Sequence, residues 1–157
     1  TLPGVTWVPV ESAQEMHAAC MDLADRDVLV KAAAVGDYRA KEPSPEKVKR
    51  RGREDWSLEL TANRDIAADL GARKRPGQVL VGFAAETRDL VAHAREKLAA
   101  KGLDLIAAND VTAPGAGFGG DRNEVRLLAP EGELGVLAGT KEEVADLLWD
   151  HIVPRMA

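Results

Sequence analysis

The sequence contains a single cysteine, Cys20, and no long apolar run. One cysteine excludes an internal disulfide framework, and its place in a predicted helix without nearby zinc-ligand spacing favours a buried structural thiol. No run approaches the roughly 20 apolar residues of a membrane-spanning helix. The start of the chain, residues 1–4, has neither the basic nor the apolar segment of a signal peptide. These absences predict a cytoplasmic protein without a membrane partner.

The chain has no excess of positive charge and few aromatic residues. The formal net charge is −5 at pH 7, which disfavours general nucleic-acid binding, and aromatic residues make up 4% of the chain. The three histidines lack metal-ligand spacing and no serine has a GxSxG context, so zinc hydrolysis and triad chemistry have no support. A length of 157 residues with 45% hydrophobic content predicts one globular domain.

Strand patterns alternate with helical patterns along the chain. Strands are predicted at residues 5–10, 28–35, 56–60, 79–83 and 103–108, with a hairpin formed by 124–128 and 134–137. Helices are predicted to begin at the N-caps Ser12, Asn63, Thr87 and Thr140, of which the first and last belong to capping boxes. The alternation predicts an α/β fold whose mostly parallel sheet is flanked by helices, with a late antiparallel hairpin.

The predicted strand 28–35 ends in Gly36 and is followed by Asp37, Tyr38 and Arg39. Ligands of open α/β sheets lie at the carboxyl ends of the strands. The next residues carry many cations: Lys41, Lys47, Lys49, Arg50, Arg51 and Arg53. A carboxylate beside a basic loop suits a metal-bound polyphosphate. A solvated loop, or an ion pair between Asp37 and Arg39, explains the same residues equally well.

Two lysines, Lys97 and Lys101, lie one turn apart on or beside the apolar stripe of the helix predicted from Thr87. An anionic ligand would offset the cost of placing both charges beside the core. Snorkelling of the lysines towards water at the helix end is the alternative. Phe83, at the end of its strand, either stacks on a base or packs in the core.

A glycine-rich stretch, residues 115–120, reads GxGxxG. It precedes a strand late in the chain, whereas a dinucleotide fingerprint opens a helix after the first strand. It is therefore rejected as a dinucleotide site, and no Walker A sequence is present.

Several segments together resemble a known family. They are Ala33–Arg39, Pro45–Lys49, Asn63–Ile66, Gly82–Thr87, Ala94–Lys97 with Lys101, Ala108–Val111, and Gly117–Phe118 with Asn123. Their order and spacing resemble bacterial phosphopantothenate–cysteine ligase, the synthetase half of the bifunctional coenzyme A biosynthesis protein. The resemblance covers essentially the whole chain and implies a three-layer Rossmann-like fold.

The resemblance implies a two-step ligation. The carboxylate of 4′-phosphopantothenate attacks the α-phosphate of CTP, which gives an acyl-cytidylate and pyrophosphate. The amine of L-cysteine then displaces CMP and forms the amide. The protein must neutralise charge on phosphate oxygens during the first step, so Mg²⁺ is expected with the CTP co-substrate.

The resemblance also assigns residues. It places Asp37 at the metal and the nucleotide, and Lys47 on the triphosphate as the catalytic residue at the base of a flap. The other expected CTP contacts are Lys31, Ala32, Ala33, Arg64, Asp65, Ile66, Ala67, Phe83, Lys97 and Lys101. Arg64 stands where the family usually has proline, which favours the first helical turn; an arginine there could contact the nucleotide instead.

The family has an earlier βαβ segment with an Asn-x-Ser-Ser-Gly motif that residues 1–157 lack, so the chain is expected to be a partial ligase domain with little activity alone. The resemblance further implies a homodimer formed through residues 124–137, and a flavin-dependent decarboxylase half with FMN in the parent protein. Two other readings stay open: a nicotinamide-dependent oxidoreductase on a Rossmann-like sheet, and a non-catalytic nucleotide-binding fragment.

Overall fold

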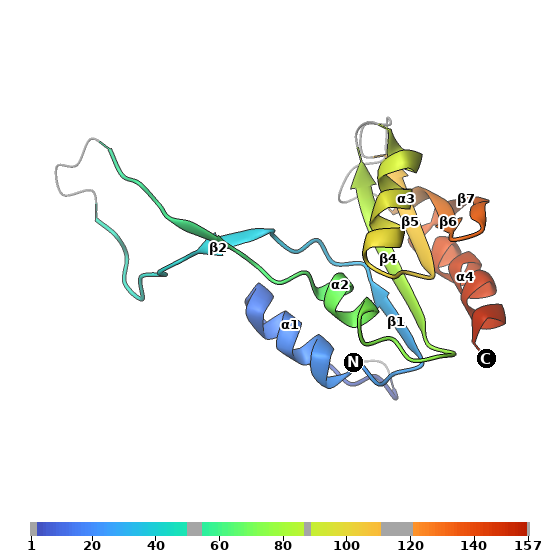
Figure 1. Cartoon of the computed structure of the whole chain (residues 1–157), viewed down its shortest axis with the longest axis horizontal. Helices are drawn as coiled ribbons and strands as arrows, with labels where there is room; N and C mark the ends of the chain where they lie inside the picture. The colour runs from blue at the N-terminus through green and yellow to red at the C-terminus, as the bar shows by residue number, and fades with distance from the viewer. Residues whose placement is uncertain (1–2, 50–54, 87–88, 111–120, 157) are drawn as a thin grey trace.

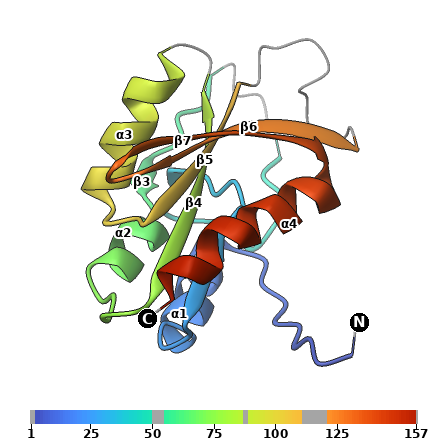
Figure 2. The same cartoon turned by 90° about the vertical axis from the view of Figure 1, so that its right-hand side faces the viewer.

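Helices cover both faces of a five-stranded sheet in this computed structural model, which describes residues 3–49, 55–86, 89–110 and 121–156 (Figures 1 and 2). In spatial order the strands are β1 (Val28–Lys31), β4 (Val79–Glu86), β5 (Leu105–Asp110), β6 (Arg122–Ala129) and β7 (Gly132–Thr140). The helices are α1 (Ala13–Asp22), α2 (Ile66–Gly71), α3 (Leu90–Ala100) and α4 (Lys141–Ile152), followed by the 3₁₀ turn η1 (Val153–Arg155).

The sheet is mixed. Strands β1, β4 and β5 are parallel, with Lys31 opposite Gly82 and Val81 opposite Leu105. Strand β6 is antiparallel to both of its neighbours, β5 and β7, and β6 and β7 form the predicted hairpin. The predicted α/β class and the late antiparallel addition are therefore confirmed, and the parallel part is limited to three strands among the described residues. The carboxyl ends of these three strands share one edge of the sheet.

Two apolar clusters give the three layers. On β4, Leu80 and Ala84 point to the cluster under α1, α2 and α3, whereas Val79 and Val81 point to the cluster under α4. This follows from the alternation of side chains along a strand. Because both faces are covered, β4 reads as a continuous apolar run.

Both predicted capping boxes are present. The Ser12 and Thr140 hydroxyls each accept a hydrogen bond from the backbone N–H of the glutamate three residues later. The carboxylate of that glutamate accepts one from the backbone N–H of the N-cap residue. The predicted strand over 5–10 is wrong, because those residues form no strand and pair with no described strand. Thr87 and the glycine-rich stretch 115–120 lie outside the described residues.

The prediction of Asn63 as an N-cap is wrong. Helix α2 begins later, at Ile66, and its N-cap is Asp65, whose side chain accepts the N–H of Ala68. Asn63 is used elsewhere, since its amide donates to the carbonyl of Gly36 at 2.8 Å. The asparagine therefore binds the loop that follows β1.

A ribbon of two antiparallel strands, β2 (Tyr38–Ala40) and β3 (Leu60–Ala62), projects from the body of the sheet (Figure 1). We call residues 38–62 the arm. Its start was predicted as loop and its return strand as 56–60, so the pairing is a finding of the structure. Among the described residues, no helix has both the length and the apolar character needed to cross a bilayer.

Candidate functional site

The carboxyl end of β1 carries the first predicted site residues. Lys31 closes the strand, and its ammonium donates to the carbonyl of Ala33 at 3.1 Å. Ala32 and Ala33 are exposed, so their backbone is accessible at the sheet edge. Leu29 packs into the α1–α3 cluster, and side chains two residues apart share a face. Lys31 therefore lies on the α1–α3 side of the sheet.

Cys20 lies on the same side of the sheet. Partial burial raises the pKa of the Cys20 thiol, and the positive charge of Lys31 opposes that rise without cancelling it. The side chain packs against the α1–α3 cluster. A thiol with a raised pKa is a poor nucleophile at neutral pH, which agrees with the structural role predicted for it.

Asp37 is exposed at the base of the arm, and no side-chain partner for it is found among the described residues. Its backbone carbonyl accepts the N–H of Asn63 at 2.8 Å. The predicted alternative, a pair with Arg39, is not what the structure shows. One Nη of Arg39 instead donates to the Ala62 carbonyl and to the Asn63 side chain. The Asp37 carboxylate is therefore held at a fixed place and left open to solvent.

A single open carboxylate fits one kind of metal site. No group of three or more potential metal ligands is found in the described part of the chain, so a closed protein cage for a metal is absent there. Mg²⁺ is commonly bound by one or two carboxylates together with substrate phosphates. Asp37 fits that arrangement.

Helix α2 brings the next predicted residues to the same side. Ile66 and Ala67 are buried in the α1–α3 cluster, so only their backbone could meet a ligand. Arg64 and Asp65 are exposed at the start of the helix. Asp65 forms an ion pair with Lys101 of 2.9 Å between Oδ2 and Nζ.

Lys97 in α3 and Lys101 at its C-cap were predicted either to meet an anion or to reach water at the helix end. Both are half-buried, beside the buried residues Ala94 and Leu98. Lys101 has an internal counterion in Asp65, which the sequence did not reveal. The structure thus joins α2 and α3 through a charged pair at the position expected to contact CTP.

Phe83 and Lys47 lie apart from this group. Phe83 packs partly against the cluster under α4, on the opposite face of the sheet from α3, as its core alternative predicted. Lys47 is exposed in the described part of the arm beyond β2, which projects away from α2 and α3 (Figure 1). Within one chain, the structure does not bring either side chain to Lys101.

The sequence did not reveal the structural roles of three polar residues. Asn63 fastens the loop that carries Asp37, and His17 of α1 contacts Asp69 of α2 at 2.7 Å. The side-chain oxygen of Asn109, at the end of β5, is buried and has no hydrogen-bond partner in the described part of the molecule. The position of Asn109 at the end of a buried strand was a signal that could have identified it. No pattern in the sequence pairs His17 with Asp69, which are 52 positions apart.

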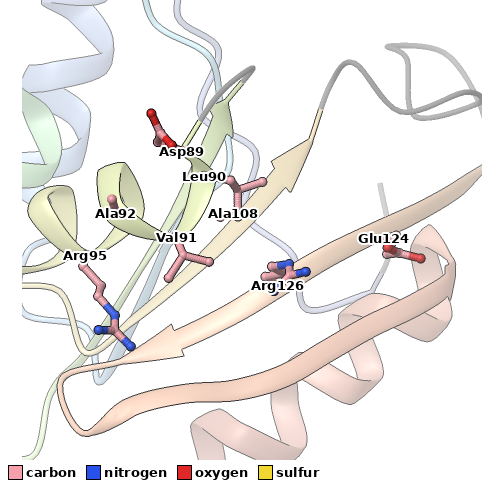
Figure 3. Close-up of a pocket in the computed structure, with 8 residues that line it drawn as sticks. All are labelled: Asp89, Leu90, Val91, Ala92, Arg95, Ala108, Glu124 and Arg126. Carbon is pink, nitrogen blue, oxygen red and sulfur yellow. The ribbon is translucent and has the colours of Figure 1, made fainter.

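The cavity in Figure 3 is separate from these residues. Its volume is about 810 Å³, and it lies between the start of α3 and strands β5 and β6. Its lining is Asp89, Leu90, Val91, Ala92, Arg95, Ala108, Glu124 and Arg126, none of which was predicted to bind CTP. Arg126 is already paired with Glu133 at 3.0 Å.

Asp65 contributes to stability both through its ion pair with Lys101 and as the N-cap of α2, and we expect two substitutions to measure these contributions separately. Asp65→Asn keeps a good N-cap but removes the charge, so the free energy of unfolding should fall by less than about 1 kcal/mol for this partly exposed pair. Asp65→Ala also removes the cap and should cost about 1 kcal/mol more. Urea denaturation of both variants measures the difference; equal losses would contradict it.

Acid should weaken the α2 region. Partial burial raises the pKa of Asp65, but hydrogen bonds from Lys101 and the Ala68 N–H outweigh burial and lower it. The hydrogen bond of His17 is the main cause of the lowered pKa of Asp69. A lowered folded-state pKa gives stability that is present above the usual aspartate pKa of about 3.9 and is lost as the pH falls through the folded value. Melting temperatures of the double variant Asp65→Asn/Asp69→Asn should therefore change less below about pH 4 than those of the parent chain.

The fold and the site together define an α/β domain with lysines and an open carboxylate beside one face of its sheet. The chain matches the model of the DNA/pantothenate metabolism flavoprotein C-terminal domain over residues 1–156, and it belongs to this family.

Curated relatives agree with that assignment. The coenzyme A biosynthesis bifunctional protein CoaBC of Bacillus subtilis (strain 168) is 46% identical over 127 residues, which cover 80% of this chain and 31% of the relative. The protein of the same name from Escherichia coli (strain K12) is 39% identical over 158 residues, covering 99% of this chain and 39% of the relative. The chain thus spans 31% to 39% of the length of these relatives.

Solved structures show the same fold. The C-terminal domain of a CoaBC protein superimposes with a TM-score of 0.71 at 32% identity, covering 97% of this chain and 67% of that one. A DNA/pantothenate metabolism flavoprotein from Streptococcus pneumoniae superimposes with a TM-score of 0.76 at 24% identity, covering 100% and 74%. The latter supports the fold alone.

Proposed function

We propose that this chain forms part of a phosphopantothenate–cysteine ligase of coenzyme A biosynthesis. In this reaction 4′-phosphopantothenate and L-cysteine are joined with CTP through an acyl-cytidylate, with release of pyrophosphate and CMP. The observation that carries the proposal is the placement of Lys31 and the open Asp37 carboxylate at and just beyond the carboxyl end of the parallel strand β1. The family membership of the whole chain supports it.

Each group has a role in the activation step. The ammonium groups of Lys97 and Lys101 offset charge on the phosphates of CTP, and Asp65 fixes the position of Lys101. Asp37 would hold Mg²⁺ together with phosphate oxygens, and the bound ion would supply further charge neutralisation at the phosphates. Arg64 would contact the nucleotide from the start of α2. Together these groups would favour the loss of pyrophosphate.

Lys47 lies on the arm, so it can contact a nucleotide only where the arm reaches one. Because the arm projects from its own body, we propose that it reaches the site of a second copy in a homodimer (Figure 1). The arm exposes large apolar side chains, namely Tyr38, Val48, Trp56, Leu58 and Leu60. Several exposed large apolar side chains on one projecting segment fit a surface that a partner covers. The hairpin β6–β7 stays a second predicted dimer contact, where Val136 is half exposed.

The bifunctional name of the relatives supports one more proposal. We expect the parent protein to carry, or to assemble with, a flavin-dependent decarboxylase half that holds FMN, and to act in the cytoplasm. We expect that half, and not the residues of this chain, to hold the flavin.

The first test is calorimetric titration of the chain with CTP and Mg²⁺, with ATP and NADPH as comparison ligands. We expect CTP binding that is strongly weakened by Lys97→Ala and by Asp37→Ala. Lys141→Ala, at the exposed start of α4 on the other face, is the matched lysine control and should bind as the parent does. Binding of NADPH in preference to CTP would overturn the proposal.

A further inference from the structure

A network of three side chains connects α1 to Arg64, and none of the roles predicted from the sequence involves this network. Nε2 of His17 lies 2.7 Å from Oδ2 of Asp69. Nε of Arg64 lies 2.9 Å from the same oxygen. Oδ2 of Asp69 thus accepts hydrogen bonds both from His17 of α1 and from Arg64, the predicted nucleotide contact. The pair between His17 and Asp69 spans 52 residues of sequence, so it exists only in the folded protein.

Burial differs along this chain of contacts. The side chain of His17 is 13% exposed, that of Asp69 is 27% exposed, and that of Arg64 is 67% exposed. The inner end of the network is therefore fixed by packing between α1 and α2, and its outer end faces solvent. A buried anchor with an exposed cationic end is the arrangement expected for a group that positions another.

The chemistry of the contacts fixes their direction. Ionised Asp69 accepts hydrogen bonds only, so the Nε2 atom of His17 must carry the hydrogen. On Arg64 the bond uses Nε, which leaves the edge formed by the two Nη nitrogens for another partner; no contact of that edge with a described residue is found. Two parallel N–H groups on one edge of a guanidinium match the oxygens of a phosphate.

We propose that His17 and Asp69 are positioning residues that hold Arg64 with its Nη edge towards a phosphate of the nucleotide. The inference rests on the proposed function, because it takes the bound nucleotide as the ligand. It adds that α1, a helix that contributes no residue to the expected CTP contacts, determines how Arg64 is presented. A lysine at position 64 would lose the effect, since it offers no paired edge.

The test is steady-state kinetics of the complete ligase that contains this chain, with CTP varied. We expect His17→Phe, which keeps a ring of similar size but no donor, to raise KM for CTP about fivefold to tenfold with little change in kcat. His17→Gln places an amide nitrogen near the position of Nε2 and should restore most of the affinity. His93→Phe, at an exposed position of α3, is the control for a histidine substitution.

A double-mutant cycle separates positioning from general stability. In an Arg64→Ala background, His17→Phe should have no further effect on KM, because the group that it positions is gone. An additive loss in that background, or an unchanged KM in His17→Phe with CTP turnover intact, would overturn this inference and leave the proposed function standing. Wild-type protein without CTP-dependent turnover would overturn both.

Discussion

The variant Lys47→Gln should lose most of its turnover while keeping its fold. Lys47 is exposed on the arm, so its substitution removes no packing and should change the free energy of unfolding by less than about 0.5 kcal/mol. If the ammonium meets the triphosphate in the transition state, its loss should lower kcat by about 10²-fold to 10³-fold, as for other groups that stabilise developing charge. Pyrophosphate release by the complete ligase measures this effect.

The control for Lys47→Gln is Lys49→Gln, two residues along the same exposed segment. It changes the net charge of the arm equally and should retain most of the activity. Equal losses in both variants would mean that the arm acts through its overall charge. A parallel loss of turnover and stability in Lys47→Gln would rule out the catalytic role. Mixing inactive Lys47→Gln subunits with inactive Asp37→Ala subunits tests the dimer proposal, since activity should partly return if the arm acts on a second copy.

The second large effect is expected from Gly71→Ala. A Cβ built at Gly71 would lie 1.9 Å from the carbonyl oxygen of Lys101 and 2.9 Å from its carbon. These are backbone atoms, so no side-chain rotation relieves the overlap and the ends of α2 and α3 must separate. Forced overpacking of this kind costs about 1–3 kcal/mol or more. We expect a clear fall in the unfolding midpoint.

The same substitution should weaken CTP binding, because Lys101 is both the residue that would be displaced and the partner of Asp65. Gly36→Ala is the control for stability: a Cβ there would meet only the Tyr38 carbonyl, at an ordinary 3.6 Å. Its unfolding midpoint should not fall. If Gly71→Ala also left the midpoint unchanged, the close contact between α2 and α3 would not exist in solution.

Local patterns predicted the elements that local chemistry determines. The capping boxes at Ser12 and Thr140 and the hairpin β6–β7 depend on residues a few positions apart, and all were predicted correctly. Asn63 was assigned to the wrong task for the same reason. Asparagine is a good N-cap, but here a long-range bond to Gly36 outweighs that preference.

Long-range charge pairing explains what the sequence could not show at the site. The helical stripe correctly placed Lys101 beside the core, yet its counterion Asp65 comes from another helix. Phe83 could not be assigned to a face either, because a strand with both faces covered has no polar side to orient it. The expected CTP contacts of these residues stay predictions until ligand binding is measured.

The clamp made by Asn63 has a consequence for how the chain tolerates change. Its bonds to Gly36 and Asp37 bring the two ends of the arm together beside β1. The entropic cost of bringing the ends of such a segment together grows only with the logarithm of its length, by about 0.6 kcal/mol per doubling. The arm beyond β2 and β3 is therefore a site at which length and sequence can vary almost independently of the sheet, so that its reach can change while Lys31 and Asp37 keep their places.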